Sequence, residues 1–171
     1  MKGKPLFLLL FFLLVAALLS QVNVPGYTRV RIRDGGTGRQ ILSNVVRDGE
    51  DVVMTWKNSL FGLQVTEVFQ AQSGMLVLRS VTFADPQGSA PPVVSPSDVD
   101  DLYHTGGAFT AGGLSRPFRH IAYRVAEIGK PRMRVRGREV DFKQEVGFGG
   151  SVILTAATAK AFEIVLESAS P

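Results

Sequence analysis

Between residues 28 and 83 the chain alternates apolar and polar residues, and this pattern limits the fold more than any other feature. Val30 and Ile32, for example, alternate with Arg29, Arg31 and Arg33. A period of two predicts β-strands that turn one face toward a core and the other toward solvent. We therefore expect strands over residues 28–33, 40–46, 52–56, 63–69 and 75–83, with glycine-bearing turns between them.

The second half of the chain continues this pattern after a long irregular segment. Residues 84–117 are rich in proline and glycine and show little alternation, which predicts a long loop that is either functional or disordered. Further strands are expected over 118–125, 132–136, 140–142, 152–155 and 162–166, and residues 156–161 could form a short helix. Closely spaced strands without a helical stripe predict a single all-β domain over 28–171, either an antiparallel sandwich or a small barrel.

The N-terminus has a different composition. Lys2 and Lys4 precede an unbroken apolar run over residues 6–19, which predicts a secretory signal peptide in residues 1–20 and a short leader in 21–27. The run is shorter than the ~20 residues of a comfortable membrane span, so cleavage near Ala17 and Ser20 is expected. An uncleaved anchor is the alternative, because Leu18-Leu19-Ser20 is a weak cleavage motif, and only then would the protein meet the membrane.

Composition excludes several kinds of site. The chain has no cysteine, so disulfides, thiolate metal sites, cysteine nucleophiles and a lipid-modified cysteine are all excluded. Two of its 19 basic residues lie in the signal segment, and the remaining 17 face 15 acidic residues, a balance that does not indicate a polyanion binder. The glycine-rich stretch 147–150 lacks the setting of a nucleotide loop. We expect no cofactor, no nucleic-acid partner and a location in the periplasm or cell envelope.

The strongest polar constellation lies on the third and fourth expected strands. Asn58 is in phase with Met54 and Trp56, and Glu67 is in phase with Val65, so both polar side chains should point toward the apolar face. A turn around residues 61–63 would place Asn58 and Glu67 opposite or nearly opposite each other, ~5 Å apart and able to hydrogen-bond. Burial would raise the pKa of the carboxyl. The pair is either a functional site or a structural pair that fixes the hairpin register.

The same segment resembles an exported bacterial family known as domain of unknown function 1850. The resemblance rests on Trp56-Lys57-Asn58-Ser59-Leu60 followed by Glu67-Val68-Phe69, and it covers roughly residues 49–155. Members typically carry His-Ser-Val after an aromatic residue, with a glutamate nine positions beyond the histidine. Ser59 and Glu67 fit that pattern, whereas Asn58 replaces the histidine and Leu60 the valine.

The resemblance implies a role rather than a reaction. Family members are small and exported, and they are often encoded beside TRAP-type solute transporters, especially those of the TAXI class. The protein would then be an envelope accessory whose partners are transporter subunits or their solute. Its polar site would consist of Trp56, Asn58, Ser59 and Glu67. No reaction is implied, and an amide at position 58 cannot transfer protons.

Two weaker constellations remain. The long loop contains a group of potential oxygen and nitrogen ligands for a cation, although the glycine and glutamate of an EF-hand are missing: Asp98, Asp100, Asp101 and His104. A second group could place guanidinium groups on strand faces for an anionic partner: Arg132, Arg134, Arg136 and Arg138. A solvated acidic loop and a solvated strand face are the simpler interpretations.

Three functions are therefore left open by the residues. The first is a non-enzymatic extracytoplasmic accessory or binding protein of a TRAP-type uptake system. The second is an envelope hydrolase with Glu67 or His104 as its base. A Ser-His-Asp triad could combine Ser59 with His104 or His120, but no G-x-S-x-G elbow supports it. The third is a structural module that binds an anionic surface through its arginines.

Overall fold

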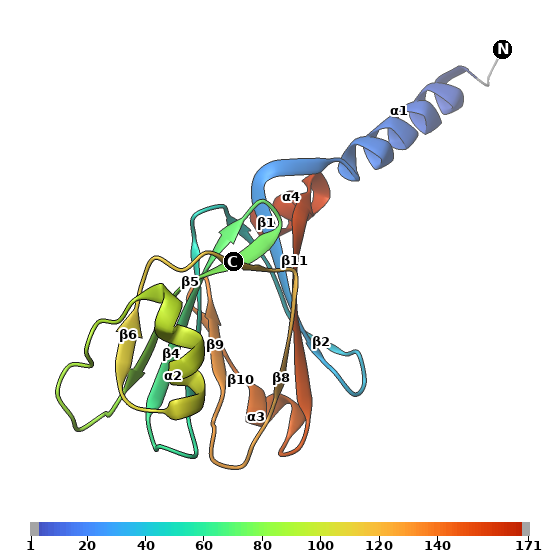
Figure 1. Cartoon of the computed structure of the whole chain (residues 1–171). Helices are drawn as coiled ribbons and strands as arrows, with labels where there is room; N and C mark the ends of the chain where they lie inside the picture. The colour runs from blue at the N-terminus through green and yellow to red at the C-terminus, as the bar shows by residue number, and fades with distance from the viewer. Residues whose placement is uncertain (1–3, 169–171) are drawn as a thin grey trace.

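The structure, a computed structural model, describes residues 4–168 and consists mainly of two antiparallel β-sheets (Figure 1). The sheets face each other in a sandwich-like arrangement that is not closed. The expected antiparallel sandwich is thus confirmed, and the alternative of a small closed barrel is wrong. Residues 1–3 of the expected signal segment and residues 169–171 of the expected domain lie outside the described residues.

The two central strands of the smaller sheet are the first and the last strand of the chain. Its order is β2 (Gln40–Arg47), β1 (Asn23–Asp34), β11 (Ser151–Lys160) and β8 (His120–Arg124). β1 pairs on one side with β2 and on the other with β11, where Thr28 lies opposite Thr158 and Asp34 opposite Val152. This sheet therefore depends on pairing between distant parts of the chain.

The larger sheet is built mostly from neighbouring hairpins. It runs in the order β10 (Arg138–Asp141), β9 (Arg132–Val135), β3 (Asp51–Lys57), β4 (Gln64–Gln72), β5 (Met75–Ala84) and β6 (Phe109–Ala111). A short strand, β7 (Arg116–Phe118), also pairs with β5. Short turns join β3 to β4 and β4 to β5, as the glycine-bearing breaks in the sequence predict.

The core lies between the sheets and is formed by the alternating apolar positions. Val30, Ile32, Val52 and Val65 are fully buried, and Met54 is almost so. These residues belong to three strands of the two sheets, and each has the inward phase that the period of two predicts. The alternation therefore gave the correct face for the strands that carry the candidate site.

A buried polar junction joins the two sheets at one end. The Thr28 hydroxyl on β1 donates to Asp48 Oδ1 at 2.8 Å and accepts from the Gly74 amide at 3.0 Å. The amide of Ser73 donates to the other oxygen of Asp48 at 2.8 Å. Thr28 is fully buried, so these bonds supply the partners that a hydroxyl out of water requires.

The segment 84–117, expected to be one long loop, contains regular structure. It holds a 3₁₀ turn (Pro96–Asp98), the helix α2 (Val99–Thr105) and the strands β6 and β7. Ser95 accepts a hydrogen bond from the Ser97 amide, and Pro96 occupies the first turn, a recognised signal for a helix start. Val99 and Phe109 are buried, which ties the segment to the core.

The C-terminal assignments are reversed relative to expectation. β11 continues through residue 160, where a short helix was offered for 156–161, and residues 161–168 form the helix α4 (Ala161–Ser168) instead of a strand over 162–166. Glu163 explains the position of the helix. Its carboxylate is buried against Arg29 and Arg31 of β1 and accepts from the Lys160 amide at 2.9 Å.

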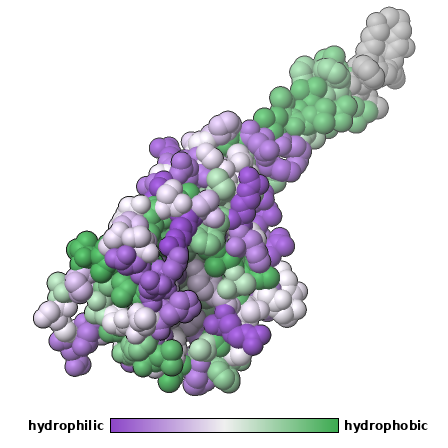
Figure 2. Space-filling view, viewed as in Figure 1, coloured by the Kyte–Doolittle hydropathy of each residue, from purple (hydrophilic) through white to green (hydrophobic). Residues whose placement is uncertain are grey.

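The N-terminal helix α1 (Lys4–Ser20) projects from the sandwich beside α4 (Figure 1). In the space-filling view the coloured part of this helix is mainly apolar, in contrast to the mixed surface of the domain (Figure 2). Among the described residues, no helix is long and apolar enough to cross a membrane. Residues 21 and 22 already belong to the fold, since the Lys160 ammonium contacts Gln21 and the Ala161 amide donates to Val22.

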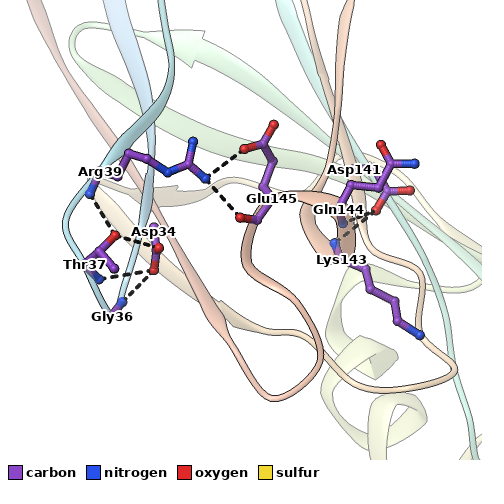
Figure 3. Close-up of polar contacts among 8 residues, drawn as sticks. All are labelled: Asp34, Gly36, Thr37, Arg39, Asp141, Lys143, Gln144 and Glu145. Carbon is purple, nitrogen blue, oxygen red and sulfur yellow. Dashed lines mark hydrogen bonds and ion pairs between the residues drawn. The ribbon is translucent and has the colours of Figure 1, made fainter.

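At the opposite end, polar contacts fasten the β1–β2 turn to α3 (Phe142–Val146) (Figure 3). Asp34 accepts from the Gly36 amide and the Thr37 hydroxyl within the turn. Arg39 then donates to both the carbonyl and a carboxylate oxygen of Glu145, each at 3.0 Å. These contacts are exposed, so they orient the turn more than they stabilise the fold.

Candidate functional site

The candidate site begins on the β3–β4 hairpin, where Glu67 points into the sandwich. Glu67 lies opposite Met54 and shares its face of β4 with the buried residues Val65 and Phe69. The inward direction predicted for the carboxyl is thus confirmed. Trp56 lies on β3 opposite Val65, on the same face of the sheet as Glu67, and it is half-buried.

The direct Asn58–Glu67 contact expected from the sequence is wrong. The hairpin loop begins at Asn58, whose backbone amide pairs with the Leu63 carbonyl, so this residue lies beyond the end of the ladder. Its side-chain oxygen accepts from the amides of Leu60 and Phe61 at 2.9 and 3.1 Å. Asn58 therefore shapes the turn, as asparagine commonly does, while Glu67 finds other partners.

The partners of Glu67 come from three separate elements. The Tyr103 hydroxyl on α2 donates to Oε1 at 3.0 Å, and the Tyr123 hydroxyl on β8 donates to Oε2 at 3.5 Å. The indole of Trp56 on β3 is a third neighbouring donor, which lowers the pKa of Glu67. All three donors are neutral, and among the side chains that the structure describes no lysine, arginine or histidine forms an ion pair with Glu67.

Burial controls the protonation of this cluster. Desolvation raises the pKa of Glu67 above its ordinary value, and the hydrogen bonds from Tyr103, Trp56 and Tyr123 oppose that rise. Burial and the nearby carboxylate also raise the pKa of both tyrosines, so the hydroxyls keep their protons. The group is thus a carboxyl that holds a proton more tightly than usual, surrounded by permanent donors.

Aromatic packing fixes the donors in place. Phe83 of β5 contacts Trp56 edge-on, with ring centroids 6.0 Å apart, and Tyr103 edge-on at 5.1 Å. It also stacks on Phe109 of β6 at 4.8 Å. Edge-to-face pairs of this kind are favourable arrangements. A rigid aromatic wall therefore orients two of the three groups that contact Glu67.

Cavities open on both sides of Glu67. The first has a volume of about 380 Å³, and all four residues of the predicted polar site line it, namely Trp56, Asn58, Ser59 and Glu67. The second has a volume of about 390 Å³ and contains Tyr103 and His104 in its lining. Glu67 and Tyr123 belong to both linings. The four residues of the predicted polar site therefore lie along one cavity, although the contact expected between Asn58 and Glu67 is not made.

The two walls of this region touch at Gly106. The ring of Phe61, in the β3–β4 turn, lies so close to Gly106 at the end of α2 that a β-carbon on Gly106 would overlap it. Gly106 also has a φ of +81°, a conformation that favours glycine. The turn that carries Asn58 and the helix that carries Tyr103 are therefore in direct contact.

The residues of the weak metal prediction are not assembled. Among the described residues, no three acidic or histidine side chains form a group able to hold a metal ion. Asp100 pairs with Arg116 at 2.6 Å, and Asp98 accepts from the Ser97 hydroxyl at 3.0 Å. Asp101 is exposed, and His104 lies in the lining of the second cavity. The geometry gives the acidic segment a structural use at Asp100 and no cation site.

The arginines predicted to bind anions are also dispersed. Arg132 pairs with Glu139 and Asp141, and Arg136 pairs with Glu167 and lies 3.9 Å from Glu50. Arg136 occupies the β9–β10 turn with a φ of +48° instead of the strand. Arg134 and Arg138 lie on adjacent strands and are exposed. The four therefore do not form one ladder of free guanidinium groups.

Tyr103 and Tyr123 were missed as site residues by the sequence reasoning. Tyr123 alternates with Ile121 and Val125, so its inward direction was available from the period of two. Its contact with Glu67 was not, because β8 and β4 belong to different sheets. Tyr103 lies in the segment taken as a loop, where the Ser95-Pro96 helix start was the one usable signal.

Comparison with known proteins adds no homologue to this description. No family model, curated protein or solved structure matches the chain. The resemblance over residues 49–155 therefore stays a prediction.

Proposed function

We propose that the chain is an extracytoplasmic binding protein that recognises a small molecule at Glu67 and serves a TRAP-type solute uptake system. One observation carries the binding site. Glu67 is a mostly buried carboxyl at the junction of two cavities, and its partners are neutral donors instead of a cation. Perturbed titratable groups in a cavity are characteristic of functional sites.

The arrangement favours binding over a purely structural role. A polar pair that only fixed the hairpin register would lie within the β3–β4 ladder, whereas the partners of Glu67 come from β3, α2 and β8. Three elements are needed to surround one carboxyl beside open space. Desolvating that carboxyl costs folding free energy. A binding role for the carboxyl would account for this cost.

The link to TRAP-type uptake is supported by the sequence resemblance. Ser59 and Glu67 match the family pattern, and both line the first cavity. An accessory protein of this kind would bind the solute or a transporter subunit, and the N-terminal segment would export it.

The binding role is tested with Glu67→Gln, which keeps the shape of the side chain and removes its charge. The exposed carboxyl of Asp51 at the start of β3 provides the matched control, Asp51→Asn. We expect both variants to keep the circular dichroism spectrum of the parent protein. Unfolding of Glu67→Gln alone would support the structural interpretation instead.

The transporter link is tested by crosslinking the tagged protein in native envelopes and identifying the captured proteins by mass spectrometry. Recovery of TRAP membrane or solute-binding subunits with the parent protein and with Asp51→Asn is the expected result. Capture of the tagged protein alone would remove the accessory role and leave a self-sufficient binder.

One observation favours a hydrolase as the second candidate. Glu67 has a raised pKa, as catalytic carboxyls often do, and His104 lines the same cavity. This function predicts turnover whose pH profile follows the carboxyl or the histidine. Background rates with ester, amide and glycoside substrates at every pH would exclude it.

A further inference from the structure

We propose that the ligand of the Glu67 cavity carries an ammonium group, which pairs with the Glu67 carboxylate inside an aromatic enclosure. The inference rests on the proposed binding function and specifies the chemical class of the ligand. Two carboxylates within the molecule have partners of different kinds.

Glu163 and Glu67 are both largely removed from water. Glu163 is 8% exposed, and it meets the guanidinium groups of Arg29 and Arg31. Glu67 meets only neutral hydroxyl and indole donors. Buried charges in proteins are normally paired, so the ionised form of Glu67 lacks a countercharge that the described chain provides elsewhere. An incoming cation would supply it.

Glu67 also has room for another donor. An ionised carboxylate has about four acceptor positions. The hydroxyls of Tyr103 and Tyr123 account for two of them, and the Trp56 indole lies near a third. The open position is consistent with an N–H group of an ammonium ion. The first cavity reaches the carboxyl directly, since Glu67 is part of its lining.

The surrounding side chains suit a cation with an apolar body. Trp56, Tyr123 and Met54 line the first cavity with Glu67. Aromatic faces attract cations, and they also pack against hydrocarbon groups. A volume of about 380 Å³ fits a small molecule of this type better than a polymer.

Other charged groups restrict the ligand further. Lys57 and Arg124 are exposed members of the same lining, so a second cationic group there would be repelled. A carboxylate on the ligand would be tolerated at that position. In the lining of the second cavity, which also contains His104, Arg116 is already paired with Asp100. A monoamine or an amino acid therefore fits this charge pattern better than a diamine.

The pH dependence of affinity distinguishes an ammonium ligand from a carboxylic acid ligand. Burial raises the pKa of Glu67, so at pH values below that pKa an ammonium ion must displace the carboxyl proton. Amine binding should then strengthen as pH rises through the pKa of Glu67 and should release a proton. A carboxylic acid ligand would favour the protonated site and would weaken over the same range. Lys57, Arg124, His104, Asp100 and Arg116 are the other charged or titratable groups lining the two cavities.

The test uses isothermal titration calorimetry of the full chain with three matched sets of probes. Leucine is compared with isoamylamine and 4-methylpentanoate, phenylalanine with phenethylamine and 3-phenylpropanoate, and alanine with ethylamine and propanoate. Each set shares one hydrocarbon side chain and differs in its charged groups. We expect binding by the amine or the amino acid of at least one set and none by the corresponding acid.

Two further measurements make the result specific. Glu67→Gln should lower the affinity for the amine at least about tenfold, which is the equivalent of one charge-assisted hydrogen bond. Asp51→Asn should leave the affinity for the amine unchanged. Titrations of the parent protein in buffers of different ionisation enthalpy should reveal proton release. This second measurement does not depend on the folding of any variant.

The outcomes separate the two proposals. Binding of acids alone, stronger at low pH, would overturn the cation inference and leave the binding function intact. Amine affinity that is equal in Glu67→Gln and the parent would also overturn it. If no probe binds, the cation inference fails, while recovery of transporter subunits by crosslinking would still support the accessory role.

Discussion

At the scale of single residues, Glu67 should make the protein less stable as pH rises. Its folded pKa is raised, so the folded state binds a proton that the unfolded chain releases near pH 4.5. The free energy of unfolding should therefore fall between the unfolded pKa and the higher folded pKa. Urea unfolding at a series of pH values would detect this fall, and Glu67→Gln should remove it. Parallel profiles for the two proteins would contradict the prediction.

Tyr103 should lower the pKa of Glu67 through its hydroxyl. Removing that donor in Tyr103→Phe leaves the carboxylate with less hydrogen bonding, so the pKa of Glu67 should rise further, and the free energy of unfolding at low pH should change by no more than about 1 kcal/mol. A carbon-13 NMR titration of the glutamate carboxyls would measure the pKa. Tyr27→Phe, on β1 and away from the cavity, is the control and should have no effect.

The sequence predicted the directions of individual side chains better than their partners. The inward phase of Trp56 and Glu67 followed from alternation within one strand, which local sequence determines. The proposed Asn58 partnership was wrong because the turn is centred between residues 60 and 61, earlier than the expected 61–63, so Glu67 lies opposite Met54. Tyr103 and Tyr123 reach Glu67 through tertiary structure, which a pattern within one strand does not contain.

At the scale of elements, the docking of α4 should depend on Glu163. Glu163→Gln would leave the partly buried guanidinium groups of Arg29 and Arg31 without their countercharge, and losing one partner of such a cluster costs about 3 kcal/mol. Hydrogen exchange of α4 amides should accelerate, and the free energy of urea unfolding should fall. Unchanged exchange in α4 would show that other contacts hold the helix.

The matched control is the exposed ion pair of Arg39 with Glu145 shown in Figure 3. Glu145→Gln removes the same charge from a solvated position, where such pairs contribute less than about 1 kcal/mol. Arg39 would also keep its contact with the Glu145 carbonyl. A loss as large as that of Glu163→Gln would argue that burial does not explain the difference.

The C-terminal elements show why element types were harder to predict than strand phase. Ala156 and Ala159 have modest strand propensity, yet they are buried within β11. The following residues, Phe-Glu-Ile-Val-Leu, are too few to distinguish alternation from one helical turn. The interaction of Glu163 with β1 favours the helix, and that interaction joins residues more than a hundred positions apart.

At the scale of the whole molecule, the β4–β5 turn should be critical for joining the sheets. Gly74 has a φ of +75°, and a β-carbon there would overlap the backbone of Thr158 in β11. Gly74→Ala should therefore lower the free energy of unfolding by more than the 1–2 kcal/mol, roughly, of left-handed strain alone. Gly137→Ala, with a φ of +78° and open space around it, should show only that strain. Equal losses would refute the proposed clash.

The sandwich could be predicted from sequence, whereas the order of its strands could not. Period-two alternation and short turns indicate antiparallel hairpins, and β3, β4 and β5 follow one another in the larger sheet as expected. Nothing in that pattern indicates that β1 pairs with β11. The contact between Tyr123 of the smaller sheet and Glu67 of the larger sheet depends on this long-range pairing, because β8 pairs with β11.

The central place of β1 and β11 has a consequence for the time course of folding. The larger sheet can gather neighbouring hairpins as the chain emerges, but the smaller sheet must wait for residues 151–160 before its middle is complete. Long-range strand pairing is intrinsically slow, commonly milliseconds to seconds. Until then β1 has an unpaired edge, and Tyr123 reaches Glu67 only after β8 has joined β11. The cluster around Glu67 is therefore completed among the last parts of the molecule, and the proposed binding site would exist only after synthesis has reached the C-terminal strand.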